Sequence, residues 1–425
     1  MILGDFMKDI LKRFIQKTIP EKYTRLMKSF IPYKYRLGRE FFSFLSLLYE
    51  NEHRAYEEIQ DYQFVKLKNL TENAYKYSSF YKRKYDDYGF NPKQLKDHSD
   101  ISKIPFLTKD EVRQNGKFMI LSNFNGRTCR CYTSGTTGKA LEFYDNNKGI
   151  SREWASICYQ WERIGYKFTD GRVEFRGFLE GDIDYLILPE HNVLRINIVK
   201  MSTKNIDSII KKINTSGYKY FHGYPSAIYK FAKILSDKEY TLNPKGIMLA
   251  SEILYDWQMD IIDKIFPDSL KISIYGQAEK VAYGAWTQDN RYYSFIPTFG
   301  FLEIDNKTRE MIATGFVNEI MPFIRYKLTD TIEDCSFSPL CPDKTLFPVI
   351  KKILGRDADY TYTLNGEIIS PALVTFPFNK LKYIKACKVI QNSLENFDLI
   401  LETDKNIPEA VNEGKALVSD LKKIY

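Results

Sequence analysis

The chain has 425 residues, of which 44% are hydrophobic, and a formal net charge of +8. Its length exceeds one ordinary domain, so we expect a large core with a smaller module beside it. The charge favours anionic ligands, but the lysines are spread along the chain and no zinc-finger, homeodomain or RNA-binding signature occurs, which argues against a nucleic-acid-binding protein. No run approaches the roughly 18 apolar residues of a membrane span, and no signal peptide is recognisable.

The six cysteines lack the spacing of a disulfide framework or of a zinc site. Free thiols in a reducing cytoplasm are therefore expected. Cys335 and Cys341 leave a metal site with a third ligand open as the less favoured alternative, because no histidine lies near them in the sequence.

The first residues combine apolar and basic side chains at helical spacing, as in Phe6 and Ile10 with Lys8 and Lys12. We treat residues 1–52 as a basic amphipathic N-terminal extension. A helix of this kind either packs on the protein itself, which is the commoner outcome, or lies on an anionic membrane surface. Peripheral membrane contact through this extension is therefore the alternative to a purely cytoplasmic protein.

A long helix is predicted at residues 53–88, where an apolar stripe runs until the Asn-Pro pair at 91–92. Thr108 is a suitable N-cap for a short helix that follows. Two strand-like segments come next, at 129–131 and 141–144.

The turn between these two segments, residues 132–139, is the most informative stretch of the chain. Its Ser and Thr hydroxyls, two glycines and Lys139 form a combination that suits the phosphates of a nucleotide. An ordinary P-loop is excluded, because Lys139 is followed by Ala140 and a strand instead of by Ser or Thr and a helix. A flexible Ser/Gly linker is the less favoured alternative, since such linkers normally lie among polar residues.

Strands and helices alternate beyond this turn, which predicts an α/β fold. The expected elements are a helix at 150–161, a strand at 218–221, a junction at 223–226, a helix at 228–235, and strands at 247–250 and 272–275. Ligands of α/β sheets collect beyond the carboxyl ends of strands, so the loops after these strands are expected to line a site. From Phe295 the pattern is β-rich, and residues 354–357 have the composition of a hinge into a small C-terminal module.

Four of these segments, in this order and spacing, resemble the adenylate-forming superfamily of acyl-CoA synthetases and peptide-synthetase adenylation domains. Residues 132–139 are similar to its phosphate-binding loop and residues 275–279 to its Tyr-Gly-x-Thr-Glu motif. Asp330 matches its ribose-binding Asp, and Arg356 its hinge arginine. Less specific segments place the resemblance in the phenylacetate:CoA ligase-like branch associated with capsular polysaccharide synthesis. These segments are 77–81, 104–111, 223–226 and 369–371.

The resemblance implies a large domain of packed mixed sheets and helices with a β-rich subdomain, at residues 53–355. A small, shortened α+β C-terminal domain at residues 356–425 is expected after the hinge. We expect the acyl pocket between the helix at 154–161 and the junction at 223–226.

Site residues follow from the matched positions. Lys139, Glu279 and Arg356 are the implied catalytic residues: Lys139 would neutralise the departing pyrophosphate, Glu279 would hold Mg²⁺, and Arg356 would reach the ribose or phosphate. Tyr275 would stack on adenine and Asp330 would accept both ribose hydroxyls. The implied nucleotide-binding residues are Thr133, Ser134, Gly135, Thr136, Thr137, Gly138, Ser251, Glu252, Tyr275, Gly276, Gln277 and Asp330. Core packing for Tyr275, and a solvated surface or loop role for the others, are the structural alternatives.

The implied reaction joins a carboxylic acid to ATP, giving an acyl-adenylate and pyrophosphate. A second step would transfer the acyl group to a thiol, amine or hydroxyl, with CoA, an amino sugar and a carrier protein all open as acceptors. Modification of a surface polysaccharide is the expected context.

Three departures from the family pattern weaken the enzyme interpretation, and two of them, Ala278 and the unmatched late Gly-Lys motif, support a second hypothesis, a catalytically weakened nucleotide-binding scaffold or partner protein. Ala278 stands where a Thr or Ser hydroxyl is usual, and Ala358 where the hinge Asp or Lys is usual. The family's late Gly-Lys motif is not matched near Tyr425, and we do not assign its role to the Gly-Lys pair at 414–415.

Overall fold

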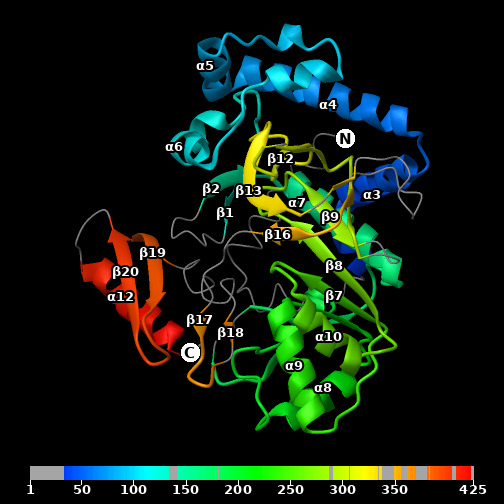
Figure 1. The fold of residues 1–425 in the computed structure, drawn as a ribbon, viewed down its shortest axis with the longest axis vertical. Coiled ribbons are helices and arrows are strands. Elements are labelled where there is room, and N and C mark those ends of the chain that lie inside the picture. Colours follow the sequence, from blue (N-terminus) through cyan, green and yellow to red (C-terminus); the bar gives the residue numbers. More distant parts are fainter. Residues whose placement is uncertain are drawn as a thin grey trace, which may run out of the picture.

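The computed structural model describes residues 33–133, 141–177, 179, 181–286, 291–305, 307–333, 335–336, 349–355, 361–366, 368–369, 381, 383–403 and 408–422. Two larger sheets form the body, and a small module that ends in a helix lies beside it (Figure 1).

A mixed ten-stranded sheet runs through the body. Its strands are β3 (Arg172–Phe175), β4 (Tyr185–Leu188), β5 (Val193–Ile196), β6 (Tyr220–Gly223), β7 (Gly246–Ala250), β8 (Leu270–Gly276), β9 (Tyr283–Trp286), β10 (Tyr293–Phe295), β14 (Cys335–Ser336) and β15 (Val349–Ile350). Their order is β14-β15-β10-β9-β8-β7-β6-β3-β5-β4. Strands β5, β3, β6, β7 and β8 are parallel, and the strands on either side of them are antiparallel.

Helices cover both faces of this sheet. Phe221, Ile247 and Leu249 pack against α8 (Ile206–Ser216), α9 (Pro225–Asp237) and α10 (Asp256–Ile265). The alternate residues Tyr220 and Met248 pack against α3 (Gly38–Glu52) and α7 (Asn147–Trp161). Figure 1 shows α8, α9 and α10 grouped together at one end of the sheet. Because both faces are covered, the parallel strands are apolar on both sides, as is usual for buried parallel sheets.

Helix α3 belongs to this packed core. Phe41 is fully buried and its ring lies 5.5 Å from that of Phe168. The part of the predicted N-terminal extension that the structure describes therefore packs on the protein itself. The basic amphipathic segment with Phe6 and Ile10 lies outside the described residues.

A four-stranded antiparallel sheet forms the β-rich subdomain, which confirms the predicted β-rich pattern after Phe295. Its strands are β11 (Gly300–Ile304), β12 (Glu310–Gly315), β13 (Tyr326–Ile332) and β16 (Ile353–Gly355). It shares a core with α4 (Tyr56–Tyr77), α5 (Ser79–Asp87) and α6 (Lys109–Met119). Thr108 caps α6 as predicted: its hydroxyl accepts from the Glu111 N–H at 3.3 Å, and the Glu111 carboxylate accepts from the Thr108 N–H at 2.8 Å.

The single helix predicted at 53–88 is wrong. The chain is extended at Ser78, which separates α4 from α5. The Ser78 hydroxyl accepts from the Tyr81 N–H at 3.3 Å, and Ser is a strong N-cap residue that competes with helix continuation. Short 3₁₀ turns complete the helical elements: η1 (Tyr33–Arg36), η2 (Pro92–Gln94), η3 (His98–Lys103), η4 (Glu162–Ile164) and η5 (Pro189–His191).

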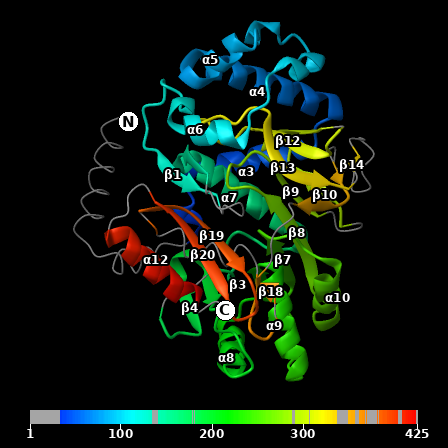
Figure 2. The ribbon, with the colours of Figure 1, turned by 60° about the vertical axis from the view of Figure 1, so that its left-hand side comes forward.

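The C-terminal module has the predicted α+β character. It contains β17 (Thr361–Tyr362), β18 (Ile368–Ile369), β19 (Ile384–Gln391), β20 (Phe397–Thr403) and α12 (Pro408–Leu421). Leu417 and Leu421 on α12 pack with Leu399 and Leu401 of the β19–β20 hairpin. Figure 2 shows α12 lying along this hairpin. The predicted fold class is confirmed.

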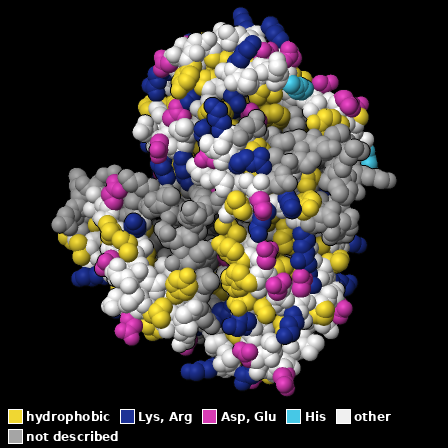
Figure 3. Space-filling model, in the orientation of Figure 1, with side chains coloured by type: hydrophobic (Ala, Val, Ile, Leu, Met, Phe, Trp, Pro, Cys, Tyr) yellow, Lys and Arg dark blue, Asp and Glu magenta, His cyan; other side chains and the backbone are white. Residues whose placement is uncertain are grey.

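The surface carries charges of both signs. Over the coloured part of the face in Figure 3, Lys and Arg side chains are interspersed with Asp and Glu. Among the residues that the structure describes, none of the helices has the length and apolar character needed to cross a membrane.

Candidate functional site

The carboxyl edge of the parallel strands brings together residues from several loops. Arg176, Tyr224, Ser251 and Gln277 directly follow β3, β6, β7 and β8. Strand β3 lies between β5 and β6 in the sheet. After β3 the next strands, β4 and β5, are added on one side of it, whereas β6, β7 and β8 are added on the other side. Strand order therefore reverses between β3 and β6, and ligands of open α/β sheets bind at such a point.

The two sheets meet at the predicted nucleotide site. The Tyr275 hydroxyl, at the end of β8, donates to Asp330 Oδ2 of β13 at 2.5 Å. In the loop after β8, Glu279 Oε1 accepts from the hydroxyl of Tyr326, which is also in β13, at 3.0 Å. Both carboxylates are buried. The structure thus places the Tyr-Gly motif and the Asp330 motif side by side, although 55 residues separate Tyr275 from Asp330.

The loop after β8 is a tight turn. A Cβ at Gly276 would lie 2.8 Å from the Tyr283 ring, so only glycine fits there. The Gln277 carbonyl accepts from the Lys280 N–H at 3.0 Å, and its side-chain oxygen accepts from the Ala282 N–H at 3.3 Å. This turn directs Glu279 inward and leaves Ala278 exposed.

The predicted phosphate turn is held between two paired strands. Strands β1 (Cys129–Tyr132) and β2 (Glu142–Asp145) form an antiparallel hairpin, which confirms the predicted strand-like flanks. Thr133 closes the loop: its N–H donates to the Leu141 carbonyl at 3.0 Å, and its hydroxyl accepts from the Leu141 N–H at 3.0 Å. The other predicted residues of the turn lie outside the described residues, as does Arg356. They are Ser134, Gly135, Thr136, Thr137, Gly138 and Lys139.

Ser251 and Glu252, the predicted site residues after β7, lie in a loop that contacts the start of α9. Ser251 has a left-handed φ of 72°, which is uncommon outside glycine and often marks functional loops. Glu252 Oε2 accepts from the Ser226 N–H at 3.2 Å, in the first turn of α9. A carboxylate at this position stabilises the helix N-terminus, so Glu252 has a capping role in this structure.

A buried ion cluster centred on Lys280 was not anticipated from the sequence. Its ammonium lies 2.5 Å from Asp145 Oδ2 and 3.3 Å from Glu153 Oε2. Burial acts to lower the pKa of Lys280, but the Glu153 and Asp145 carboxylates outweigh it and raise that pKa. Burial also raises the pKa of Glu153, against the opposing effect of Lys280. The only sequence signal is a lysine directly after Glu279, because Asp145 lies 135 residues away.

A second charged cluster, also missed, lies at the end of β3. Glu174 accepts from Arg172 at 2.8 Å and from Arg195 at 2.7 Å, and His222 Nδ1 lies 3.7 Å from it. Burial acts to raise the pKa of Glu174, but the nearby His222 ring and the arginine charges lower it overall. Burial lowers the pKa of His222 to about 4. His222 is therefore neutral near pH 7.

Arg176 contacts this cluster through His222. Its Nη1 is 3.4 Å from His222 Nε2, its Nη2 donates to Ser251 Oγ at 3.4 Å, and its guanidinium is 5.4 Å from the centre of the Tyr224 ring. The available signal was an arginine directly after a strand-like segment, at the same edge as the predicted loops.

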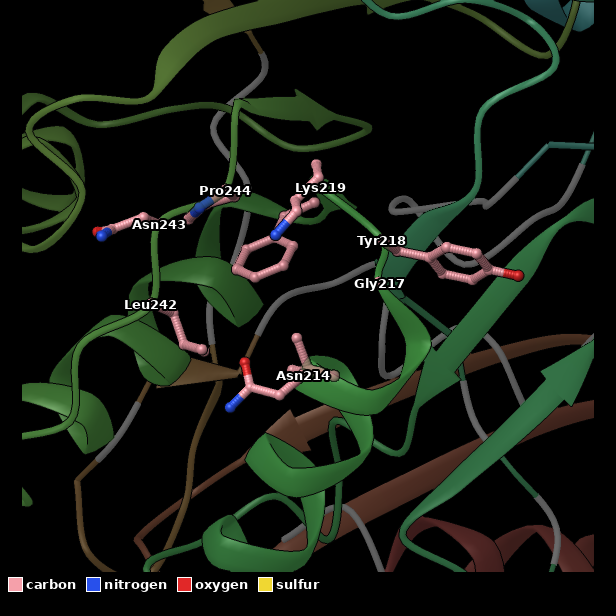
Figure 4. A pocket seen from close by; sticks show the side chains of 9 residues that line it. Asn214, Gly217, Tyr218, Lys219, Leu242, Asn243 and Pro244 are labelled. Atoms are coloured by element: carbon pink, nitrogen blue, oxygen red, sulfur yellow. The ribbon is translucent and has the colours of Figure 1, made fainter.

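A separate small cavity of about 60 Å³ lies at the opposite, amino-terminal edge of the sheet. Figure 4 shows its lining side chains, among them Asn214, Lys219 and Asn243, which precede or flank β6 and β7. A cavity of this size is far below the several hundred Å³ of ordinary ligand pockets. It is therefore unsuited to a nucleotide.

The described residues hold no group of three His, Cys, Asp or Glu side chains placed to bind a metal ion. Mg²⁺ commonly takes one or two carboxylates together with substrate phosphates. The buried Glu279 carboxylate fits that kind of shared site.

Comparisons with known proteins support the superfamily. The chain is 24% identical to the protein CapK of Staphylococcus aureus over 374 residues, which cover 84% of this chain and 80% of CapK. It is 34% identical to the phenylacetate-coenzyme A ligase of Escherichia coli over 107 residues, about a quarter of each chain. A solved structure of 2-hydroxyisobutyryl-CoA ligase, in complex with 2-HIB-AMP and CoA, matches 88% of this chain and 92% of its own with a TM-score of 0.54 at 16% identity. No protein-family model matches the chain.

These matches confirm the predicted superfamily and branch. The fold is that of adenylate-forming CoA ligases, and the sequence similarity extends to CapK and to the phenylacetate-coenzyme A ligases.

Replacing Lys280 by Met should destabilise the fold. The change leaves the Asp145 and Glu153 carboxylates close together without their counter-ion, and breaking a buried ion pair in this way costs about 3–5 kcal/mol. Urea denaturation followed by fluorescence measures the loss. The exposed lysine of the Lys82–Asp86 pair is the matched control, and Lys82→Met should leave the midpoint unchanged. A Lys280→Met protein as stable as the wild type would show that the cluster does not hold these segments together.

Acid should weaken the fold partly through His222. Its pKa is about 4 when folded against 6.5 when unfolded, so its neutral form contributes full stability above about pH 6.5, and this contribution is lost as the pH falls toward 4. In His222→Gln that loss is absent, while the arginine pairs of Glu174 remain. The stability difference between the two proteins should therefore change by up to about 1.4 kcal/mol per pH unit between pH 6.5 and 4.5. Parallel stability curves would contradict this assignment.

Proposed function

We propose that this chain activates a carboxylic acid with ATP and passes the acyl group to CoA. One observation carries the proposal: Tyr275 contacts Asp330 while Glu279 contacts Tyr326, which places two adenylation motifs together beside the strand ends. The likeness in fold to a CoA ligase in complex with an acyl-adenylate and CoA supports the same reaction type.

In this proposal the described residues hold the nucleotide. Asp330 would accept the ribose hydroxyls, and the half-buried ring of Tyr275 would lie against adenine. Glu279 would hold Mg²⁺ together with phosphate oxygens, and the bound ion would neutralise phosphate charge. Ser251 and Glu252 would line the adenine side. Lys139 and the turn from Thr133 to Gly138 would surround the phosphates, and Arg356 would reach the ribose or phosphate.

The reaction needs positioning more than a protein nucleophile. An oxygen of the acid attacks the α-phosphorus, a new P–O bond forms, and the bond to pyrophosphate breaks. The CoA thiol then loses its proton to solvent and attacks the acyl carbon, so that a C–S bond forms and AMP leaves. The protein's part is to hold the acid in line with the α-phosphorus and to exclude water.

The biological context is proposed on narrower grounds. Similarity to CapK supports a role in surface polysaccharide synthesis, in which an amino sugar or a carrier protein would be alternative acceptors to CoA. The division into an extension at 1–52, a large domain at 53–355 and a C-terminal domain at 356–425, and a peripheral membrane contact of the extension, are likewise proposals.

A nucleotide-binding scaffold is the second candidate, favoured by Ala278. This residue is exposed beside Glu279 and has no hydroxyl to offer to a phosphate.

Exchange of labelled pyrophosphate into ATP should occur only when a suitable acid is present. Asp330→Ala should raise the KM for ATP about 10- to 100-fold, because it removes a charged acceptor worth roughly 1.5–3 kcal/mol. Asp237→Ala, an exposed aspartate at the end of α9, is the control and should behave as the wild type. ATP binding without exchange across a broad panel of acids, with and without CoA, would instead support the scaffold.

Ala278→Thr should increase the exchange rate. The added hydroxyl supplies the hydrogen bond that the family pattern has at this position, and a bond of about 1.5–3 kcal/mol made mainly in the transition state corresponds to roughly a tenfold to hundredfold gain. Ala278→Val, of similar shape without the hydroxyl, is the matched control. An equal effect of both variants would mean that the hydroxyl has no phosphate to contact.

A further inference from the structure

Arg176 has few engaged donors among the described residues at this edge. It is half-buried, directly after β3, where the strand order reverses. Its contacts to His222 and Ser251 are both 3.4 Å long, beyond the usual range of good hydrogen bonds. A guanidinium has five N–H donors, so most of those on Arg176 remain available for a ligand.

Two carboxylates near Arg176, those of Glu174 and Glu153, have closer cationic partners. Glu174 pairs with Arg172 and Arg195. Glu153, the other carboxylate that interacts with Arg176, lies 3.3 Å from Lys280. His222, which faces the guanidinium directly, is neutral because burial lowers its pKa to about 4. In the described part of the chain, Arg176 forms no ion pair of its own.

The position of Arg176 is on the acyl side of the proposed site. Its guanidinium packs over the ring of Tyr224, a residue of the 223–226 junction predicted as one wall of the acyl pocket. It also interacts with Glu153 of α7, the helix predicted as the opposite wall. The Tyr224 ring supports the guanidinium from one side, and a planar guanidinium is suited to bidentate binding of a carboxylate.

An apolar acyl chain would fit this pocket poorly. It would cover the guanidinium and remove water from its N–H groups without replacing their hydrogen bonds, which is costly for a charged group. A second carboxylate on the substrate would satisfy those donors and balance the charge.

We propose that Arg176 binds a second carboxylate on the acyl substrate, so that the protein activates a small dicarboxylic acid. This inference rests on the proposed ligase function and names its substrate class. One carboxylate reacts with ATP, and the other is held by Arg176.

The experiment compares acids of equal length in the pyrophosphate exchange assay: succinate with butyrate, and glutarate with valerate. Wild-type protein should prefer the dicarboxylates. Arg176→Met should lower kcat/KM for them about 10- to 100-fold, as expected for loss of a charged hydrogen-bonded contact, and leave the KM for ATP unchanged. Arg176→Lys keeps the charge without the planar guanidinium, so its kcat/KM for the dicarboxylates should fall between those of the wild type and of Arg176→Met. Arg39→Met, on the exposed side of α3, is the control, and thermal unfolding checks that each variant is folded.

Binding of the same acids, measured by calorimetry, separates the two proposals. Exchange that prefers apolar acids and is unaffected by Arg176→Met would overturn the inference and leave the ligase function standing. Absence of exchange, with dicarboxylate binding that Arg176→Met abolishes, would overturn the ligase function and with it the activation of the acid, but would support Arg176 as the residue that binds the second carboxylate. Neither exchange nor Arg176-dependent binding would overturn both.

Discussion

The arrangement of the site depends on the buried ammonium of Lys280. It contacts Asp145 at the end of β2 and Glu153 in the helix α7, and so joins the β2–α7 segment to the loop after β8. Because Lys280 directly follows Glu279, this cluster links the Glu279 loop to β2, the strand whose other end adjoins the predicted phosphate turn. Burying the charges of Lys280 and Asp145 is costly. It is tolerable here because the ammonium contacts Asp145 and the partly exposed Glu153, and the backbone N–H of Asn146 also donates to Asp145 at 2.7 Å.

A second set of contacts joins the two sheets. Strand β13 belongs to the four-stranded sheet, yet its Asp330 and Tyr326 contact Tyr275 and Glu279 at the end of β8 in the ten-stranded sheet. The start of β13 is itself anchored by Arg325, which makes a bidentate pair with Glu303 at 3.0 and 2.9 Å. The same guanidinium donates to the carbonyls of two residues before α6. A shift of either sheet would therefore separate Asp330 from Glu279, the two carboxylates of the predicted nucleotide site.

Local sequence pattern accounted for much of the fold and for part of the site. The cap at Thr108 and the strand ends at Ala250 and Tyr275 were predictable, because capping and strand alternation are local properties. The break at Ser78 was missed, since the apolar stripe continues across it. Motif spacing predicted Glu279 and Asp330 as site residues, and the structure brings their segments together through Tyr326 and Tyr275. Motif spacing did not identify Lys280 as part of a cluster, because pairing with Asp145 depends on how the sheets and α7 pack.

The charged groups of this edge fall into two kinds. Lys280, Arg172 and Arg195 each lie within ion-pair distance of a buried carboxylate, so their charges are balanced inside the fold. Arg176 differs: it is supported from below by a neutral imidazole and by the ring of Tyr224, which position a cation without neutralising it. The pKa of His222 is low mainly because the ring is buried, and the neighbouring arginines disfavour a further positive charge beside them. Among the described residues after the strand ends, Arg176 therefore carries a charge that no carboxylate pairs with, and such a charge favours an anionic group in a ligand.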